Sequence, residues 1–220
     1  MTRILKFGRK AARSGKARSM VMFVHGYGAN GADLLGLAEV FAPHLPDTAF
    51  VAPDAPDRVA GAPSGLQWFA IPRFDGSSAA EAAAGLARSA EDLSAFIDQR
   101  LTYEGLGPQA VALIGFSQGA MMALHVAPRR PVAMAAVVAI SGQLLMPEKL
   151  QAETLTRPPM LVMHGDQDDV VPFAAMAAAA DGLAAAGFDT YGHVMQGMGH
   201  GISQDGLSTA LSFLTRHLPD

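Results

Sequence analysis

The stretch LIGFSQGAMM, residues 113–122, places a serine between two glycines, where an apolar run changes from strand to helix. Residues 110–116 are apolar on both faces, which is typical of a buried strand, and 119–127 are expected to form a helix. A sharp turn between the two would strain the backbone of Ser117 and lift its hydroxyl clear of the sheet. Glycine would be needed at positions 115 and 119, because a side chain there would collide with a neighbouring element. An ordinary loop is the alternative, so the rest of the chain must decide.

Apolar runs alternate with helical stripes along the chain. Further strands are expected at 20–26, 48–54, 132–141, 159–165 and 189–195. Further helices are expected at 32–42, 79–101, 173–187 and from Leu207 to Leu218. Residues 55–78 are expected to form a long loop, and 142–157 a brief loop without extra helices. Such an alternation is typical of an α/β domain, in which helices cover both faces of a mostly parallel sheet, and residues 1–220 are expected to form a single domain.

The composition limits the classes of partner. With 16 Lys+Arg against 20 Asp+Glu, the formal charge is −4, and no nucleic-acid partner is expected. No apolar run reaches the about 18 residues of a membrane span, so no stable membrane insertion is expected. The absence of cysteine excludes disulfides, thiolate nucleophiles and cysteine metal sites and is compatible with a cytoplasmic location, which we expect. The oligomeric state stays open, with a homodimer among the alternatives.

Seven of the 16 basic residues lie within the first 18 positions. The apolar run that follows, MVMFV, is too short for the apolar core of a signal peptide. We expect an edge hairpin with a basic turn at 9–18, and a disordered arm is the alternative.

Candidate catalytic residues lie in loops that follow strands, where parallel sheets bind their ligands. A serine hydroxyl needs a base to become a nucleophile, and the base needs an orienting acid. Among the five histidines after Ser117, only His200 lies in a strand-following loop after the acidic loop, between two glycines. The loop HGDQDDVVP offers three carboxylates, and one of them is expected to orient His200. They are Asp166, Asp168 and Asp169.

An oxyanion needs two backbone N–H donors. The residue after the nucleophile, Gln118, would supply one, and Tyr27 in the loop HGYGAN would supply the other. His25 is expected to brace that loop by hydrogen bonding rather than to take part in the reaction. Six residues of strand-following loops are expected to form an apolar wall for an acyl group, whereas Met121 and Met122 are expected in the core. The wall residues are Trp68, Phe69, Leu144, Leu145, Met146 and Met198.

Six blocks, in order over nearly the whole chain, resemble the phospholipase/carboxylesterase family, which includes acyl-protein thioesterases. The blocks are HGYGANGADLLGLA, APDAP, GLQWF, GFSQGAMM, HGDQDDVVP and GMGHGIS. The resemblance implies an α/β-hydrolase fold with little or no cap domain, and hydrolysis of carboxylic esters or thioesters without a metal or cofactor. One departure concerns Ala70, which follows the Trp-Phe pair where many members carry an acidic residue.

Carried over from the family, the nucleophile falls on Ser117, the base on His200, and the oxyanion donors on Tyr27 and Gln118. The family's acid stands four residues before the proline of the Val-Pro pair, at Asp168. Asp166 would then brace the turn through its own backbone, and Asp169 would lie solvated at the rim.

The function that follows is that of a serine carboxylesterase for esters with short to medium acyl chains, acting through an acyl-enzyme intermediate. A lysophospholipase or acyl-protein thioesterase is the alternative and would need a longer apolar groove. A ligand-binding protein that keeps the three catalytic groups but turns over slowly is a third interpretation. The expected partner is a small-molecule ester or thioester substrate.

Overall fold

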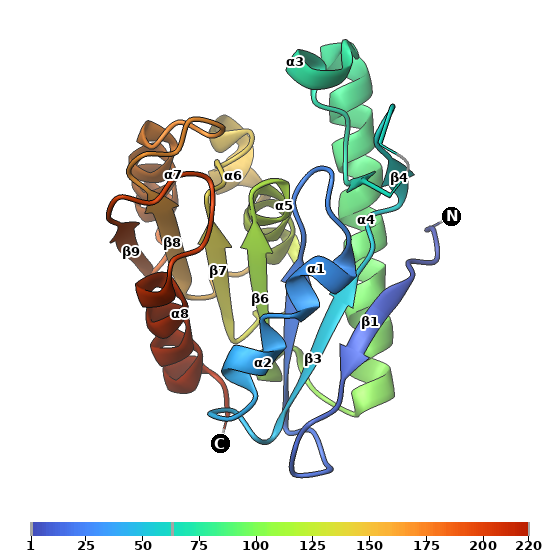
Figure 1. Cartoon of the computed structure of the whole chain (residues 1–220), viewed down its shortest axis with the longest axis vertical. Helices are drawn as coiled ribbons and strands as arrows, with labels where there is room; N and C mark the ends of the chain where they lie inside the picture. The colour runs from blue at the N-terminus through green and yellow to red at the C-terminus, as the bar shows by residue number, and fades with distance from the viewer. Residues whose placement is uncertain (1, 63, 220) are drawn as a thin grey trace.

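The computed structural model describes residues 2–62 and 64–219, and within them seven strands form one sheet. These strands are β1 (Phe7–Lys10), β2 (Ser19–Val24), β3 (Thr48–Pro53), β6 (Val111–Phe116), β7 (Ala136–Ile140), β8 (Met160–Gly165) and β9 (Thr190–Met195). Their order across the sheet is β1-β3-β2-β6-β7-β8-β9, and every neighbouring pair is parallel except β1 and β3. The parallel strands end at the upper edge in Figure 1, so the loops that follow them meet there. The predicted mostly parallel sheet is confirmed.

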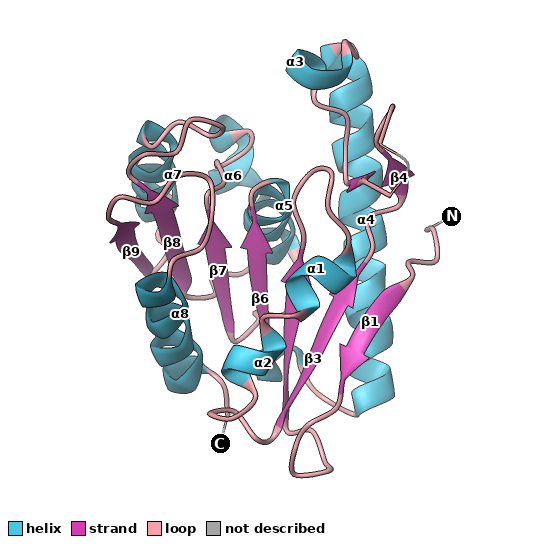
Figure 2. Ribbon diagram, in the orientation of Figure 1, coloured by secondary structure: helices cyan, strands magenta, loops and turns pink. Residues whose placement is uncertain are grey.

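Helices cover both faces of this sheet (Figures 1 and 2). One face packs against α4 (Ala79–Glu104), α5 (Gln118–Val126), α6 (Pro147–Glu153) and α7 (Ala174–Ala185). The other face packs against α1 (Gly31–Leu35), α2 (Ala38–Phe41) and α8 (Gln204–His217). Within the described ranges, no helix is long and apolar enough to cross a membrane.

Strand β2 shows how the sheet is buried between the two layers of helices. Met20, Met22 and Val24 belong to the core cluster on the α4–α7 face, whereas Val21 and Phe23 belong to the cluster on the α8 face. All five are fully buried, so the strand has no polar face, as its continuous apolar sequence predicts. Burying each such side chain contributes about 1.5–3 kcal/mol.

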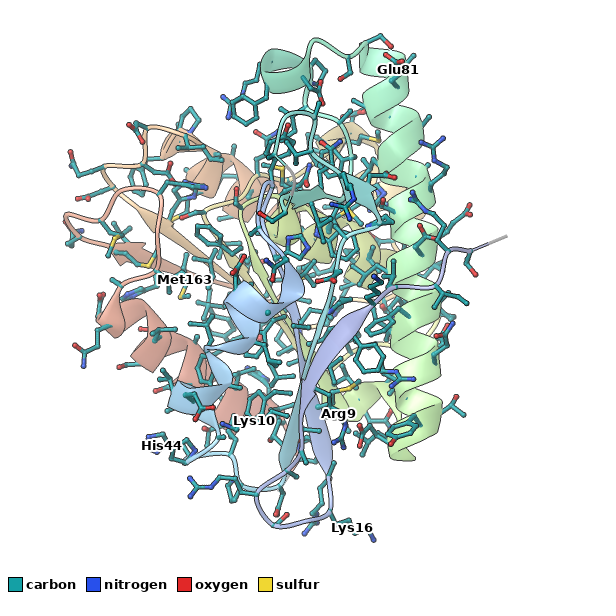
Figure 3. All side chains as sticks on the ribbon, turned by 45° about the vertical axis from the view of Figure 1, so that its right-hand side comes forward. Arg9, Lys10, Lys16, His44, Glu81 and Met163 are labelled. Carbon is teal, nitrogen blue, oxygen red and sulfur yellow. The ribbon has the colours of Figure 1, made fainter. Side chains whose placement is uncertain are left out.

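The predicted N-terminal hairpin is wrong. β1 does lie at the edge of the sheet, but it pairs with β3 rather than with β2. Because β2 is buried on both faces, it takes a central place between β3 and β6, and half-exposed β1 takes the open edge. Arg9 and Lys10 of this edge pair with Glu104 and Glu39, respectively. Figure 3 shows Arg9 and Lys10 away from Glu81, which marks the opposite end of the molecule.

The loop expected at 55–78 holds short regular elements. It carries the two-stranded ribbon of β4 (Asp57–Arg58) and β5 (Leu66–Gln67) and then α3 (Pro72–Asp75). In Figure 1, α3 stands beside the first turns of α4 at the top.

Three further segments differ from the prediction. The expectation that 142–157 holds no helix is wrong: α6 forms there because Pro147 suits a first helical turn and Leu150 is buried beneath it. The helix expected at 32–42 is divided at Gly36, a residue that weakens helix interiors. The strand expected from 132 begins only at Ala136. Two 3-10 turns, Pro108–Ala110 and Ala127–Arg129, complete the elements.

Candidate active site

Ser117 lies on a strained turn between β6 and α5. Its φ of 54° and ψ of −118° are unusual for a residue with a side chain. A Cβ atom at Gly115 would lie 2.2 Å from the carbonyl oxygen of Gly119, and one at Gly119 would lie 1.8 Å from that of Val24. The prediction that both positions need glycine is therefore confirmed, because only bare backbones can approach so closely.

His200 lies between Ser117 and Asp168. Its Nε2 atom is 3.0 Å from Ser117 Oγ, and its Nδ1 atom is 2.8 Å from Asp168 Oδ2. Because an ionised carboxylate only accepts hydrogen bonds, Nδ1 carries the proton, and Nε2 can accept the serine hydroxyl. The loops after β6, β8 and β9 thus bring together the three residues for which the sequence predicts a nucleophile, an acid and a base.

The Asp168 side chain is fully buried. Burial by itself raises the pKa of Asp168. The hydrogen bonds from His200 and from the N–H groups of Val171 and Val170 lower this pKa by a larger amount, so it is below its ordinary value. Each of the two N–H groups lies 2.9 Å from Oδ1. The carboxylate is therefore held ionised and aimed at the imidazole.

The two other aspartates of this loop lie elsewhere. Asp169 is exposed, as predicted. Asp166 does not brace its own turn: its Oδ1 accepts the N–H of Gly197 at 2.7 Å. Gly197 has a φ of 70°, and its N–H lies in the loop that carries His200. The Asp166 carboxylate therefore joins the loop after β8, which carries Asp168 (the acid loop), to the loop after β9, which carries His200 (the base loop).

The loop after β2 closes against Ser117. A Cβ atom at Gly26 would lie 3.1 Å from Ser117 Cβ, and the N–H of Gly28 is bonded to Leu66 in β5. Tyr27 of this loop and Gln118 line the hollow that contains Ser117. Gln118 is the first residue of α5, and N–H groups in a first helical turn have no acceptor within their helix.

His25 braces this loop, as predicted. Its Nε2 atom accepts the N–H of Ala55 at 2.9 Å, and its Nδ1 atom lies 2.8 Å from the oxygen of Gly26. The ring is fully buried, and burial lowers the pKa of His25. The neutral ring with its proton on Nδ1 satisfies both contacts.

Two hollows adjoin this constellation. The Ser117 hollow has a volume of about 130 Å³ and contains Ser117, His200, Tyr27 and Phe74. The apolar cavity has a volume of about 390 Å³ and contains Phe69, Leu145 and Pro172. Five residues line both hollows, which therefore adjoin, and we refer to these residues as the wall: Ile71, Arg73, Met121, Val170 and Val171. A larger hollow, of about 530 Å³, lies between the N-terminal segment and the loop after β3, and Ser117 and His200 do not line it.

The predicted apolar wall is only partly correct. Phe69 and Leu145 do line the apolar cavity. Leu144 instead lines a hollow against α7, and Met146 packs against the core as the residue that precedes α6. Met198 packs against the core on the α8 face.

Trp68 does not line a cavity, because it is fully buried. Its indole Nε1 donates to the oxygen of His25 at 2.9 Å, and its backbone N–H donates to Gln118 Oε1 at 2.9 Å. The amide nitrogen of Gln118 donates to the oxygen of Phe69 at 2.7 Å. Trp68 therefore connects the loop after β2 to Gln118 from within the core.

Sequence reasoning missed most of the residues between the two hollows. Met121 was expected in the core; it is largely buried, but it also borders both hollows. The apolar pair Val170-Val171, directly after the acidic cluster in a strand-following loop, was a signal that could have been used. Ile71 and Arg73 gave no such signal, because residues 55–78 show no periodicity.

In the part of the chain that the structure describes, no three or more His, Asp or Glu residues are arranged to hold a metal ion.

Residues 10–218 match the family model described as Phospholipase/Carboxylesterase. The chain is 29% identical to Esterase YpfH of Escherichia coli over 92% of this chain and 84% of that protein. It is 29% identical to acyl-protein thioesterase 1 of Kluyveromyces lactis over 96% of each. The crystal structure of esterase PE8 superposes with a TM-score of 0.92 at 42% identity, over 97% of this chain and 99% of that one. The chain therefore belongs to the phospholipase/carboxylesterase family and has the α/β-hydrolase fold, with no cap domain among its described residues.

Proposed function

We propose that the protein is a serine carboxylesterase that hydrolyses carboxylic esters with short to medium acyl chains. The observation that carries the proposal is the continuous line of contacts from Ser117 through His200 to Asp168, at 3.0 and 2.8 Å. In such a line the imidazole can take the serine proton while the carboxylate stabilises the charge that forms on the ring.

In the first half of the reaction, Ser117 Oγ attacks the acyl carbonyl carbon, and His200 Nε2 takes the hydroxyl proton. The backbone N–H groups of Tyr27 and Gln118 stabilise the oxyanion, since both residues line the hollow around Ser117. His200 then gives the proton to the leaving alcohol or thiol, and the acyl group stays on Ser117.

In the second half, water replaces the leaving group. The water oxygen attacks the acyl carbon while His200 takes a proton from the water. The tetrahedral intermediate collapses, the proton returns to Ser117 Oγ, and the carboxylic acid leaves. The cycle uses only groups of the protein and water, so no cofactor or metal enters it.

The preference for shorter chains rests on the wall residues, which we propose separate the two hollows. The Ser117 hollow, of about 130 Å³, is only a third of the size of the apolar cavity, of about 390 Å³. Arg73 Nη2 donates to the oxygen of Val170 at 2.7 Å and ties the two sides of the wall together. A short acyl chain fits in front of this wall, whereas a longer one must displace it.

A second candidate is an acyl-protein thioesterase or lysophospholipase. It is favoured by the apolar cavity of about 390 Å³ directly behind the wall, which could take the rest of a long chain. The name of the Kluyveromyces lactis relative points the same way. We expect a cytoplasmic location for both candidates, and a small ester or thioester as the partner of the carboxylesterase.

Two measurements test the proposal. A fluorophosphonate should label the protein once, at Ser117, and Ser117→Ala should not be labelled; labelling at another serine would reject the mechanism. Catalytic efficiency should then be measured on matched esters and thioesters from acetate to palmitate, with and without a chelator. Efficiency that keeps rising to palmitate would reject the short-chain proposal and favour the second candidate.

A further inference from the structure

A second histidine lies against the aspartate that holds His200. His164, in β8, is 1% exposed, and its Nε2 atom lies 3.2 Å from Asp168 Oδ2. The mechanism above does not use this residue. We infer that His164 is a positioning residue for Asp168, an inference that rests on the proposed serine mechanism.

The protonation of the ring follows from its other contact. His164 Nε2 lies 2.9 Å from the backbone oxygen of Val171, and a carbonyl oxygen only accepts hydrogen bonds. Nε2 therefore carries a proton. The N–H is bonded to Val171, and its positive end also lies against the carboxylate of Asp168.

Both carboxylate oxygens are thereby surrounded by donors. Oδ1 accepts two backbone N–H groups, from Val170 and Val171, while Oδ2 faces His200 on one side and His164 on the other. These are the groups that face Asp168 from the acid loop, the base loop and β8. The His164 N–H, which is bonded to Val171, lies 3.2 Å from Oδ2 and acts on the carboxylate through its partial positive charge. Because the Asp168 side chain is fully buried, this contact helps to fix the position of the carboxylate.

Loss of this donor has a definite consequence for His200. Without the His164 N–H, the buried carboxylate has more freedom to turn away from the imidazole, and His200 is then held less well for taking the Ser117 proton. A residue that merely filled space or anchored Val171 would change stability without this effect on the reaction.

Two substitutions of similar size separate these roles. In His164→Gln the side-chain amide can place an N–H close to the position of Nε2, whereas His164→Met fills a similar volume without a donor. His125→Met is the control, because His125 is also a buried histidine but lies in α5 beside Arg129. Rates of fluorophosphonate labelling and of ester hydrolysis should be measured for all variants from pH 5 to pH 9.

For His164→Met we expect kcat to fall about tenfold, because the carboxylate is aimed less well at the imidazole, with KM nearly unchanged. His164→Gln should restore most of kcat, and His125→Met should leave kcat and KM unchanged. If His164→Met does not fold, His164→Asn, whose amide is too short to reach, replaces it in the comparison with His164→Gln.

The outcomes are distinct. A wild-type protein that is not labelled at Ser117 would reject the proposed function and this inference with it. A labelled wild type in which the variant without the donor keeps the kcat of His164→Gln would reject the inference alone.

Discussion

The side chain of Asp168 is buried against His200, whereas that of the adjacent Asp169 is exposed to solvent. Asp168→Asn should therefore lower kcat by up to about 10⁴-fold, because the imidazole loses the acceptor that sets its tautomer. Asp169→Asn should cost less than about tenfold, through the change in charge of the loop. The measurement is kcat for both variants after their melting temperatures have been compared. The reverse ranking would assign the orienting role to Asp169.

The wall between the two hollows gives a prediction on chain length. Arg73→Ala removes the bond to Val170 and should open a path from the Ser117 hollow into the apolar cavity. The ratio of kcat/KM for a laurate ester to that for a butyrate ester should rise about tenfold. Arg88→Ala, which changes an exposed arginine of α4, is the control. An unchanged ratio would mean that Arg73 does not limit the acyl chain.

Two glycines should respond to alanine in opposite directions. Gly119→Ala would place a Cβ atom 1.8 Å from the oxygen of Val24, and this clash should lower the free energy of unfolding by about 3 kcal/mol or more. Gly36→Ala meets no atom closer than 3.6 Å and has a helical φ of −55°, so it should raise the free energy of unfolding by about 0.5 kcal/mol. Urea titrations of the two variants measure both effects. Equal stabilities would show that β2 moves aside at no cost.

A buried histidine should make stability depend on pH. Burial, followed by the nearby charge of Arg129, lowers the pKa of His125 from 6.5 to about 4. Above about pH 6.5 the folded protein has the full stability of the neutral ring. As pH falls from 6.5 towards 4, the unfolded chain takes up the proton first, and the free energy of unfolding falls by about 2 kcal/mol, a value discounted for incomplete burial.

His125→Gln removes this titration and should flatten that part of the stability curve, while His44→Gln, at an exposed position, should leave the slope as it is. Urea unfolding at several pH values between 4 and 7 measures the slope. If wild type and His125→Gln keep parallel curves, His125 does not contribute to the loss.

Much of the fold could be predicted because its signals are local. The continuous apolar run of β2 predicts a strand buried on both faces, and the strained turn at Ser117 is visible in its two flanking glycines. The partner of β1 was not predictable in this way. Its pairing with β3 depends on which strand leaves an open edge, and that is a property of the assembled sheet.

The same distinction between local signals and distant partners applies to the residues of the candidate site. Ser117 and His200 follow from their places after strands, and Asp168 was selected among three aspartates through the resemblance. Trp68 also follows a strand element, but its indole N–H meets the oxygen of His25, a partner 43 residues away, and the ring is buried as a result. A polar partner distant in sequence decides such a side chain, and neither composition nor periodicity reports it.

Val170 and Val171 contact both the Asp168 carboxylate and the two hollows. Their backbone N–H groups hold Oδ1 of Asp168, while their side chains form part of the wall between the two hollows. In the proposed mechanism, an acyl chain that presses on this wall therefore also displaces the carboxylate that would orient His200. A badly fitting substrate should then be turned over slowly even when it is bound at saturation, so selectivity among acyl chains should appear in kcat as well as in KM.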